Sequence, residues 1–195
     1  MPRPPIEDAR DRLLAAGLQL FARLGTERVN SNAIAKRARL GIGTFYAHFP
    51  DKHALLREIQ LRTLAGIRAA RVASLAEATA EPADQVRRST AAVVDFARLH
   101  PEAYRVTFGR ERAGASAHGP VVSESSRPTA DALRRLQAMG ALDPLLDADL
   151  AARAYLAMEV GTVLWWLDDP ARADRDDLAA TLARLHPASV AERGA

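Results

Sequence analysis

The sequence predicts an all-α protein with an N-terminal three-helix helix-turn-helix domain and a larger helical body. Alanine, leucine and arginine, which favour helices, dominate the 195 residues. Strand signals are scarce, because β-branched runs are few and no Asn-Gly or Asp-Gly hairpin turn occurs. After the N-terminus the prolines fall singly, and they separate segments in which apolar residues recur with the period of a helix.

The first part of the chain divides into three short helices. Apolar residues recur with the helical period over 7–24, and Gly25 ends that helix. Asn30 or Ser31 caps a short second helix, and 42–48 forms the third. Three short helices with one break between the second and third are typical of a helix-turn-helix, whose last helix lies in the DNA major groove.

The rest of the chain predicts a body made of helices. Asp51 is expected to cap the first of them. Residues 109–128, rich in Gly and Ser, predict a mobile loop with a partly helical end, and the tail over 188–195 is expected to fray. The predicted helices of the body are 52–80, 82–99, 101–108, 129–139, 147–168 and 174–185.

Composition limits the class of protein. Hydrophobic residues make up 48% and charged residues 26%, which is typical of a soluble globular chain. No uncharged apolar run reaches the length of a membrane span, and the N-terminus lacks the apolar core of a secretory signal. The absence of cysteine excludes disulfides, thiolate metal sites and a cysteine nucleophile, and fits a cytoplasmic protein.

Positive charge is concentrated in the N-terminal third. Residues 1–60 hold 10 Lys and Arg against 6 Asp and Glu, whereas the remainder holds 17 against 18. No acidic residue occurs from Arg28 to Pro50. A basic segment on a nearly neutral body suggests that this part of the molecule meets a polyanion.

The third helix has two different faces. Phe45 and Phe49 lie four residues apart and are expected to point inward together, with Leu40 filling the space between the second and third helices. Thr44 and Tyr46 then point elsewhere. One face is therefore expected to be core, and the other to be polar and aromatic.

Residues 13–56 read LLAAGLQLFARLGTERVNSNAIAKRARLGIGTFYAHFPDKHALL. Leu-Phe and Gly-Thr near the end of the first helix, Ile-Ala-x-x-Ala in the second, and Gly-Thr-Phe-Tyr-x-His-Phe-x-x-Lys occur in order. In these features the chain resembles the DNA-binding domain of the tetracycline-repressor (TetR) family of transcriptional regulators. The resemblance implies a DNA-binding domain over 1–52 and a helical ligand-binding and dimerisation domain over 53–195. Residues 1–6, rich in Pro and Arg, are expected to form a disordered arm.

The resemblance also implies DNA contacts at named positions. Helix N-termini favour anions, and Tyr, Thr, Ser and Lys are ordinary donors to phosphate. From the residues alone, Tyr46 can equally be an edge residue of the core, and His48 and Lys52 can be solvated surface residues. The positions with implied contacts are Asn30, Ser31, Asn32, Ile42, Gly43, Thr44, Tyr46, His48 and Lys52.

The turn before the third helix departs from the family pattern. Family members commonly have Gly-Val-Ser there, whereas this chain has Arg39, Leu40 and Gly41. Glycine is a weaker N-cap than serine. Arg39 is either an additional phosphate contact or a surface charge. Ile42 cannot hydrogen-bond a base but can touch a thymine methyl, which leaves room for readout of DNA shape.

The helix over 147–168 predicts an interface between two subunits. It is apolar on nearly every face, and a chain of this size covers only part of such a helix, so a second subunit is the simplest cover. The alternative is the central helix of a monomer. One of Trp165 and Trp166 is expected in the core and the other at the interface. The predicted dimer contacts are Met158, Gly161, Trp166, Leu178, Leu182 and Leu185.

A pocket for a small-molecule effector is expected among the helices of the body. Its candidate residues are apolar or aromatic, and each can equally belong to the core. Nothing in the sequence specifies the effector. The candidates are Phe96, Tyr104, Phe108, Met139 and Trp165.

Catalysis is not expected. Gly41-Ile42-Gly43 follows no strand and lacks a third glycine, so it is no dinucleotide fingerprint, and the histidines have no metal-binding spacing. No cofactor, metal or membrane partner is expected. Together with these observations, the resemblance to the TetR family implies a cytoplasmic, ligand-responsive regulator of the repressor type that binds a palindromic operator in double-stranded DNA as a homodimer. The alternative is a helical small-molecule-binding protein without operator binding.

Overall fold

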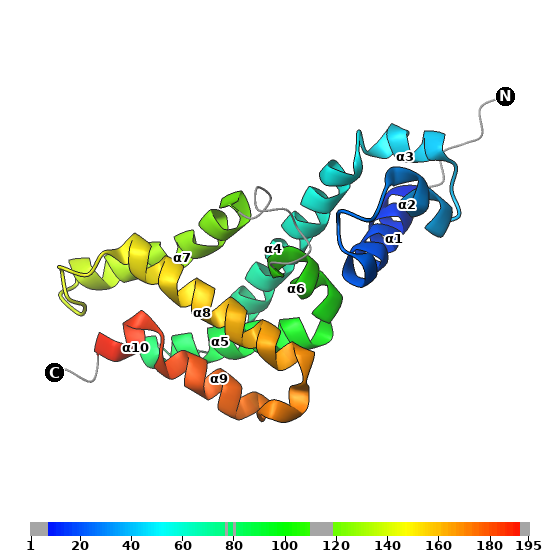
Figure 1. Cartoon of the computed structure of the whole chain (residues 1–195). Helices are drawn as coiled ribbons and strands as arrows, with labels where there is room; N and C mark the ends of the chain where they lie inside the picture. The colour runs from blue at the N-terminus through cyan, green and yellow to red at the C-terminus, as the bar shows by residue number, and fades with distance from the viewer. Residues whose placement is uncertain (1–7, 77, 80, 110–118, 192–195) are drawn as a thin grey trace. The chain divides into compact units, whose positions relative to one another are not determined.

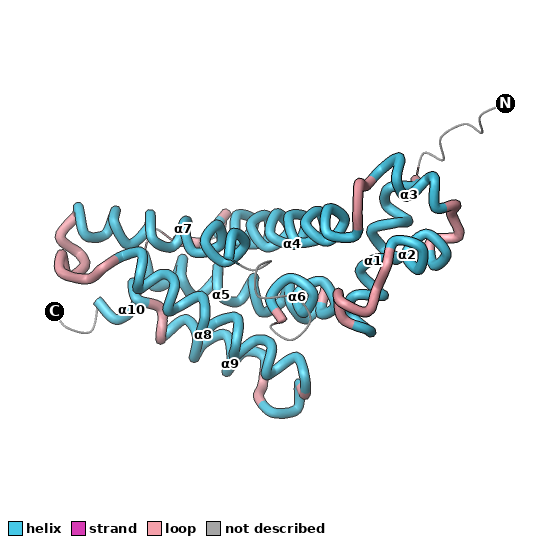
Figure 2. Tube along the Cα trace, turned by 45° about the horizontal axis from the view of Figure 1, so that its top comes forward, coloured by secondary structure: helices cyan, strands magenta, loops and turns pink. Residues whose placement is uncertain are grey.

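The structure is a computed structural model that describes residues 8–76, 78–79, 81–109 and 119–191. Within these residues the chain forms helices and loops and no strand, which Figure 2 shows by its colours. The predicted all-α class is therefore confirmed. In the same part of the chain, none of the helices combines the length and apolar character that crossing a bilayer requires.

The helices follow one another along the chain as Figure 1 labels them. Several of them begin directly after a residue whose side chain accepts hydrogen bonds from the first backbone amides of the helix. Asn30 accepts from the Ala33 amide at 2.9 Å and Asp51 from the Ala54 amide at 2.7 Å, as predicted. The elements are α1 (Ala9–Leu24), α2 (Ser31–Arg37), α3 (Ile42–His48), α4 (Lys52–Leu75), α5 (Pro82–Leu99), α6 (Pro101–Phe108), α7 (Gly119–Ala138), α8 (Ala148–Asp168), the 3₁₀ turn η1 (Pro170–Arg172), α9 (Arg175–Arg184) and α10 (Pro187–Ala191).

The chain forms two compact units. The division falls between Thr63 and Leu64 within α4, and again between Pro101 and Glu102, so that α6 belongs with α1 to α3. The second unit contains α5 and the helices from α7 onward. The predicted domain boundary between residues 52 and 53 stays a prediction, since compactness alone does not define a domain.

In the first unit, α1, α2 and α3 pack on one another around an apolar core. Phe45 and Phe49 lie in this core, and Leu40 packs against it from the turn, as predicted. Gly17 allows α1 to approach α4, because a Cβ there would meet the Leu55 side chain at 2.4 Å. The buried core residues are Leu13, Leu14, Ala16, Leu20, Phe21, Val29, Ile34, Ala35, Ala38, Phe45, Phe49, Leu55, Leu56, Ile59 and Val106.

In the second unit, α7 packs on α8 and α5 on α9, while α10 contacts α5, α7, α8 and α9. The N-caps of α8 and α9 are Asp147 and Asp174, whose side chains accept from the amides that follow. Trp166 joins α8 to the segment before α9, because its indole Nε1 donates to the Ala173 carbonyl at 3.0 Å. Acidic side chains therefore cap both of these helices.

Three predicted boundaries were wrong. The helix predicted to start at residue 129 begins at Gly119, so the helical end expected of the loop over 109–128 is longer than predicted. Pro128 lies inside α7, although proline lacks the amide that continues a helix. Pro128 is exposed, so the carbonyl that loses its amide partner can turn to solvent. Residues 110–118 of this predicted loop lie outside the described residues. Residues 188–191 of the tail that was expected to fray lie in α10, and the rest of the tail lies outside the described residues.

The third correction concerns the end of α4. The sequence predicted a helix to residue 80, whereas α4 ends at Leu75. The Asp84 carboxylate accepts a hydrogen bond from the Thr79 amide at 2.8 Å, which diverts the backbone from the helix. That backbone hydrogen bond also holds the pKa of Asp84 below its ordinary value.

Candidate nucleic-acid interface

The third helix presents one buried and one open face. Phe45 is 0% and Phe49 2% exposed, whereas Tyr46 is 56% exposed. The Tyr46 ring meets the Phe45 ring edge-on, with 5.4 Å between their centroids, and its phenol stands outside the core. Tyr46 is therefore no core residue, and its hydroxyl is accessible to a partner.

The other predicted contact residues on α3 surround Tyr46. Ile42 and Gly43 are exposed, and a Cβ at Gly43 would meet nothing within 4 Å. Thr44 and His48 are half-buried, with their backbone in the helix. The open face of α3 thus combines hydroxyl, imidazole and aliphatic groups on a backbone that another molecule can approach closely.

The turn before α3 is a Schellman turn. The Leu40 amide donates to the Ala35 carbonyl at 2.9 Å and the Arg39 amide to the Lys36 carbonyl at 3.1 Å. Such a turn needs a left-handed residue, and Arg39 has φ 56°, the one positive φ outside glycine among the described residues. The position that the family commonly fills with glycine is therefore filled here by a strained, exposed arginine.

Gly41 begins α3 without a side-chain cap. Its φ of −73° and ψ of 152° are extended, and no side chain bonds the first amides of the helix. Only its carbonyl takes part, accepting from the Thr44 amide at 3.0 Å. The predicted absence of a serine-type cap is confirmed.

The start of α2 holds the other predicted contacts. The Asn30 side-chain oxygen is occupied by the Ala33 amide, so its NH₂ group is the part that remains for a phosphate. Ser31 is half-buried and Asn32 is exposed. These side chains and those of α3 all belong to the first unit.

Lys52 has a structural contact that the sequence did not reveal. Its ammonium donates to the Thr26 carbonyl at 2.9 Å and, more weakly, to the Glu27 carbonyl at 3.5 Å. The side chain therefore ties the start of α4 to the loop between α1 and α2. An ammonium has three donors, so this contact leaves capacity for a phosphate.

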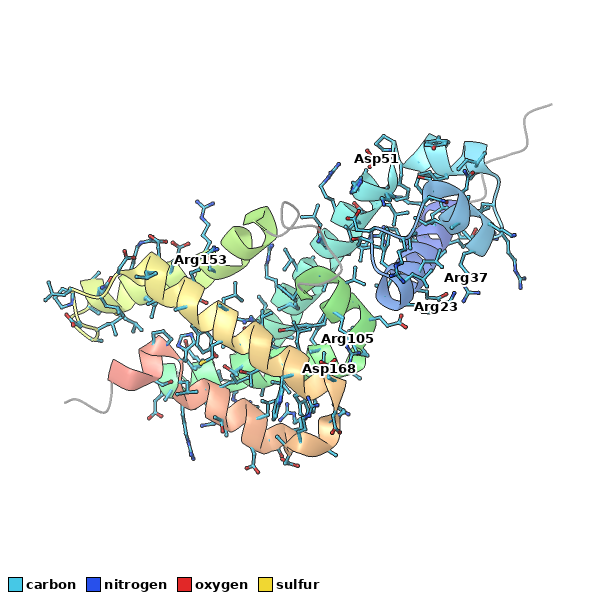
Figure 3. The ribbon with its side chains drawn as sticks, in the orientation of Figure 1. Arg23, Arg37, Asp51, Arg105, Arg153 and Asp168 are labelled. Atoms are coloured by element: carbon cyan, nitrogen blue, oxygen red, sulfur yellow. The ribbon has the colours of Figure 1, made fainter. Side chains whose placement is uncertain are left out.

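Acidic groups near α3 are engaged elsewhere. Asp51, which follows α3 and is labelled in Figure 3, uses its carboxylate to cap α4. Its pKa lies below the ordinary value, chiefly because of the hydrogen bond from the Ala54 amide. The carboxylate nearest in sequence to α3 thus serves the fold.

Sequence reasoning missed the side chains that brace α2 from α1. Arg12 Nη2 donates to the Ala38 carbonyl at 2.7 Å, at the C-terminal end of α2. Arg37, labelled in Figure 3, donates through Nη2 to the Gln19 amide oxygen at 2.7 Å. Gln19 and Arg37 are exposed polar residues, so no local sequence signal marked this contact.

The comparisons with known proteins agree with this geometry. Residues 13–59 match the family model of bacterial regulatory proteins of the tetR family. The HTH-type transcriptional regulator BetI of Stenotrophomonas maltophilia (strain R551-3) is 30% identical over 170 residues, covering 85% of this chain and 84% of that protein. The chain belongs to the TetR family.

Solved structures of other transcriptional regulators share the fold. The regulator PfmR from Thermus thermophilus superposes with a TM-score of 0.68 at 27% identity, covering 91% of this chain and 95% of PfmR. The regulator FadR from Bacillus subtilis, solved in complex with stearoyl-CoA, has a TM-score of 0.76 at 17% identity, covering 92% of this chain and 98% of FadR.

The predicted dimer contacts of this TetR-family chain require correction. Trp166, Leu178 and Leu182 are 3%, 5% and 1% exposed, so they are buried within their own chain and belong to the core of the second unit. Trp165 has the opposite environment, since it is 47% exposed, with the Arg172 guanidinium 5.4 Å from its ring centroid. Trp166, predicted at the interface, is therefore the buried tryptophan, and Trp165 is the exposed one.

An apolar strip remains open on α8. Its residues follow the spacing of one helix face, and Leu150 at one end is 65% exposed. A Cβ at Gly161 would meet nothing within 4 Å. Among the other predicted contacts, Met158 is half-buried and Leu185, after α9, is exposed. The strip consists of Leu150, Ala154, Ala157, Gly161 and Trp165.

The predicted pocket residues are not gathered in one place by the described contacts. The Tyr104 and Phe108 rings contact each other at a tilt in the first unit, with 4.8 Å between their centroids, and the other candidates belong to the second. Phe96 fills the space over Gly66, whose Cβ would meet the ring at 2.7 Å. Met139 is 71% exposed and lines no interior. Their role in binding an effector stays a prediction.

Sequence reasoning also missed a buried polar cluster in the second unit. Glu159 on α8 is 2% exposed, and Arg71 Nη2 on α4 donates to it at 3.0 Å. The Tyr155 hydroxyl lies 3.5 Å from Glu159, 3.3 Å from the Leu182 carbonyl and 3.4 Å from the Thr90 hydroxyl. Burial raises the pKa of Tyr155 above its ordinary value, so the phenol keeps its proton and stays a donor.

Proposed function

We propose that this TetR-family protein binds a palindromic DNA operator as a homodimer and that a small-molecule effector releases it. The observation that carries the proposal is the open face of α3, where Tyr46 is 56% exposed above a fully buried Phe45. The helix lies in a stretch from Arg28 to Pro50 without an acidic residue. A short helix with a polar, acid-free outer face suits the major groove.

The proposed DNA contacts fall into two groups, those suited to phosphates and those suited to bases. The Thr44 and Tyr46 hydroxyls and the remaining Lys52 donor are suited to phosphate oxygens, which position a protein on DNA. Ile42, exposed at the front of α3, is suited to a thymine methyl. His48 can serve either, and Arg39 adds a cation at the turn. Because few of these groups read base edges, specificity also depends on DNA shape.

The open strip on α8 supports a homodimer. Leu150, Ala157 and Trp165 would each be shielded from water by the same strip of a second copy, because a twofold interface pairs a surface with itself. Two copies also supply two α3 helices for the two halves of a palindrome. Gly161→Glu is expected to give monomers in light scattering, whereas Ala141→Glu, at an exposed position outside α8, is not.

The effector is proposed to act through α4, which continues from the first unit into the second. Binding among α4 to α8 would tilt α4 and change the spacing of the two α3 helices. A structure of similar fold holds stearoyl-CoA, so a long-chain acyl-CoA is the first compound to test. Operator affinity that no compound changes would contradict this coupling.

Selection of bound duplexes from random DNA tests the function directly. The protein is expected to enrich a palindrome, and the promoter beside its own gene is expected to shift in a gel. Tyr46→Ala should weaken this binding while circular dichroism and melting stay unchanged, because the side chain is mostly exposed. Failure to enrich any sequence would instead support a helical small-molecule-binding protein without operator binding.

Operator binding also determines the location of the protein and its effect on transcription. Operator binding requires it to be in the cytoplasm, where bacterial DNA lies. Repression follows where the operator overlaps the promoter, and in this role the chain catalyses no reaction.

A further inference from the structure

Arg10, in the first turn of α1, contacts the far end of the recognition helix. Its Nη1 donates to the His48 carbonyl at 3.3 Å. The same guanidinium lies 4.6 Å from the centroid of the Phe49 ring, so it covers that ring as a cation–π partner. His48 is the last residue of α3, and one side chain of α1 therefore contacts the backbone and the anchoring aromatic at that end.

This end of α3 needs an external support. The helix spans only Ile42–His48, and a helix of two turns is not stable by itself. Its other end lacks a side-chain cap at Gly41. The last carbonyls of a helix have no partner within it and carry partial negative charge, which a guanidinium satisfies.

Arg10 is in turn held by α4. Its Nη2 lies 3.5 Å from Oε2 of Glu58, whose other oxygen accepts from Arg62 Nε at 3.1 Å. Arg62 Nη1 also meets the Asp11 carboxylate at 2.7 Å, which closes the network back onto α1. The Arg10 side chain is 44% and that of Glu58 28% exposed, so the network lies at the surface of the first unit.

We propose that Arg10 is a positioning residue for operator recognition, which fixes the C-terminal end of α3 and is itself fixed by Glu58. The inference rests on the proposed function. Surface ion pairs contribute little to stability, so the benefit of this one lies in the alignment of His48 and Tyr46 with the DNA. Glu58 lies on α4, so movement of that helix reaches α3 through Arg10 as well as through the core.

The first test replaces Arg10 and a control cation on the same helix. Arg23 is exposed at the end of α1 away from α3, as Figure 3 shows, and Arg23→Gln removes the same charge. Arg10→Gln is expected to weaken binding to the selected operator about tenfold more than the control does, the scale of a lost specific contact. Binding to random duplex and the slope of log K against log salt should match the control.

Glu58→Gln tests the Arg10–Glu58 pair, because simple electrostatics and the proposed positioning role predict opposite changes in operator affinity. Removing a negative charge near DNA should by electrostatics alone tighten binding to every duplex. If Glu58 positions Arg10, operator binding becomes weaker while random-duplex binding does not. The effects of Arg10→Gln and Glu58→Gln on operator affinity should then be less than additive, because both remove one interaction. Arg10→Lys should not restore affinity, since an ammonium cannot serve the carbonyl, the ring and the carboxylate together.

Each contrary result has one meaning. Arg10→Gln could lose affinity equally for operator and random duplex, with a salt slope smaller by about one than that of the control. Arg10 would then be a phosphate contact, and the inference would be overturned. Tighter operator binding by Glu58→Gln, or additive effects, removes Glu58 from the mechanism. If the wild-type protein selects no DNA, the proposed function is refuted. If the wild type binds an operator but Arg10→Gln has the same operator affinity as Arg23→Gln, only the inference about Arg10 is refuted.

Discussion

The two units place their ion pairs in different surroundings. In the first unit, Arg62 and Asp11 form a pair whose side chains are 51% and 70% exposed. In the second, Arg71 and Glu159 form a pair whose side chains are 28% and 2% exposed. A pair in water stabilises a fold by at most about 1 kcal/mol, whereas breaking a buried pair leaves an uncompensated charge in the core.

Because of this difference, the exposed pairs can orient α3 and the buried pair can stabilise the fold. Losing an exposed pair in the first unit leaves the fold intact, so such pairs are free to orient the helix that meets DNA. The buried pair joins α4 to α8, and the Tyr155 hydroxyl ties α8 to α9 through the Leu182 carbonyl. The second unit should therefore be the part whose stability responds most to changes of charge.

Arg71→Met should have the largest effect. It leaves the Glu159 carboxylate buried without a cation, and we expect the free energy of unfolding to fall by roughly 3–5 kcal/mol. Urea unfolding followed by circular dichroism measures the loss. The matched change Arg62→Met, at an exposed pair, should cost at most about 1 kcal/mol.

A double variant separates the charge from the packing. Arg71→Met with Glu159→Leu removes both charges and should recover most of the lost stability, because apolar replacements of a buried pair are often neutral. A double variant no more stable than Arg71→Met would show that the Arg71 side chain acts by filling space. The comparison between the units would then fail.

Acid should destabilise the second unit through His186. Burial, and then the charge of Arg71, lower the pKa of His186 from 6.5 to about 4. Between these values the unfolded chain binds a proton that the folded chain does not, so stability is complete above pH 6.5 and falls as the pH drops towards 4. The loss is expected to reach roughly 3 kcal/mol.

The histidine variant isolates this contribution. In the folded chain the ring lies 4.5 Å from the Tyr155 ring, and Nδ1 accepts from the Ala188 amide at 3.1 Å, which requires the neutral form. Urea unfolding of wild type and His186→Gln should therefore differ in slope against pH within that window. Parallel curves would assign the acid sensitivity to carboxylates elsewhere.

Lys52→Met should affect both stability and DNA binding. Losing the hydrogen bond to the Thr26 carbonyl is expected to lower the free energy of unfolding by about 1–2 kcal/mol. Loss of the predicted phosphate contact should also lower the salt slope of DNA binding by about one. A stability loss with an unchanged slope would restrict Lys52 to bracing the loop between α1 and α2.

The smallest expected change in the free energy of unfolding comes from the turn after one helix in each unit. The turn after α7 contains Gly140, with φ 71°, and is of the same kind as the turn after α2 that contains Arg39. Arg39→Gly should raise the free energy of unfolding by about 1 kcal/mol, and Gly140→Ala should lower it by about the same amount. Calorimetry measures both. Unchanged stability in Arg39→Gly would mean that its side chain makes compensating contacts.

The structure of α1 to α3 in the first unit was largely predictable from the sequence. Phe45 and Phe49 at a spacing of four, the caps Asn30 and Asp51, and the terminating Gly25 are local signals, and the structure confirms each of them. Local signals suffice here because α1 to α3 are short, amphipathic and joined by tight turns. The predicted DNA contacts themselves stay predictions.

The second unit was less predictable, because its side-chain roles depend on partners distant in the sequence. Trp165 and Trp166 are adjacent and alike, and only the Ala173 carbonyl, which accepts from Trp166, decides which one is buried. The start of α7 was missed because proline and glycine normally end helices. An open strip on α8 emerged where the sequence had shown an apolar helix without a defined face.

The sequence by itself determined that the protein is helical, where most of its helices begin, and which side of α3 is buried. These properties follow from residues within a few positions of one another, through periodicity and capping. The tertiary structure decided which charged groups are buried, as for Glu159 with Arg71, and which lie at the surface, as for Arg10 with Glu58. The physical reason is that burial and pairing depend on helices from distant parts of the chain, and no local pattern encodes that.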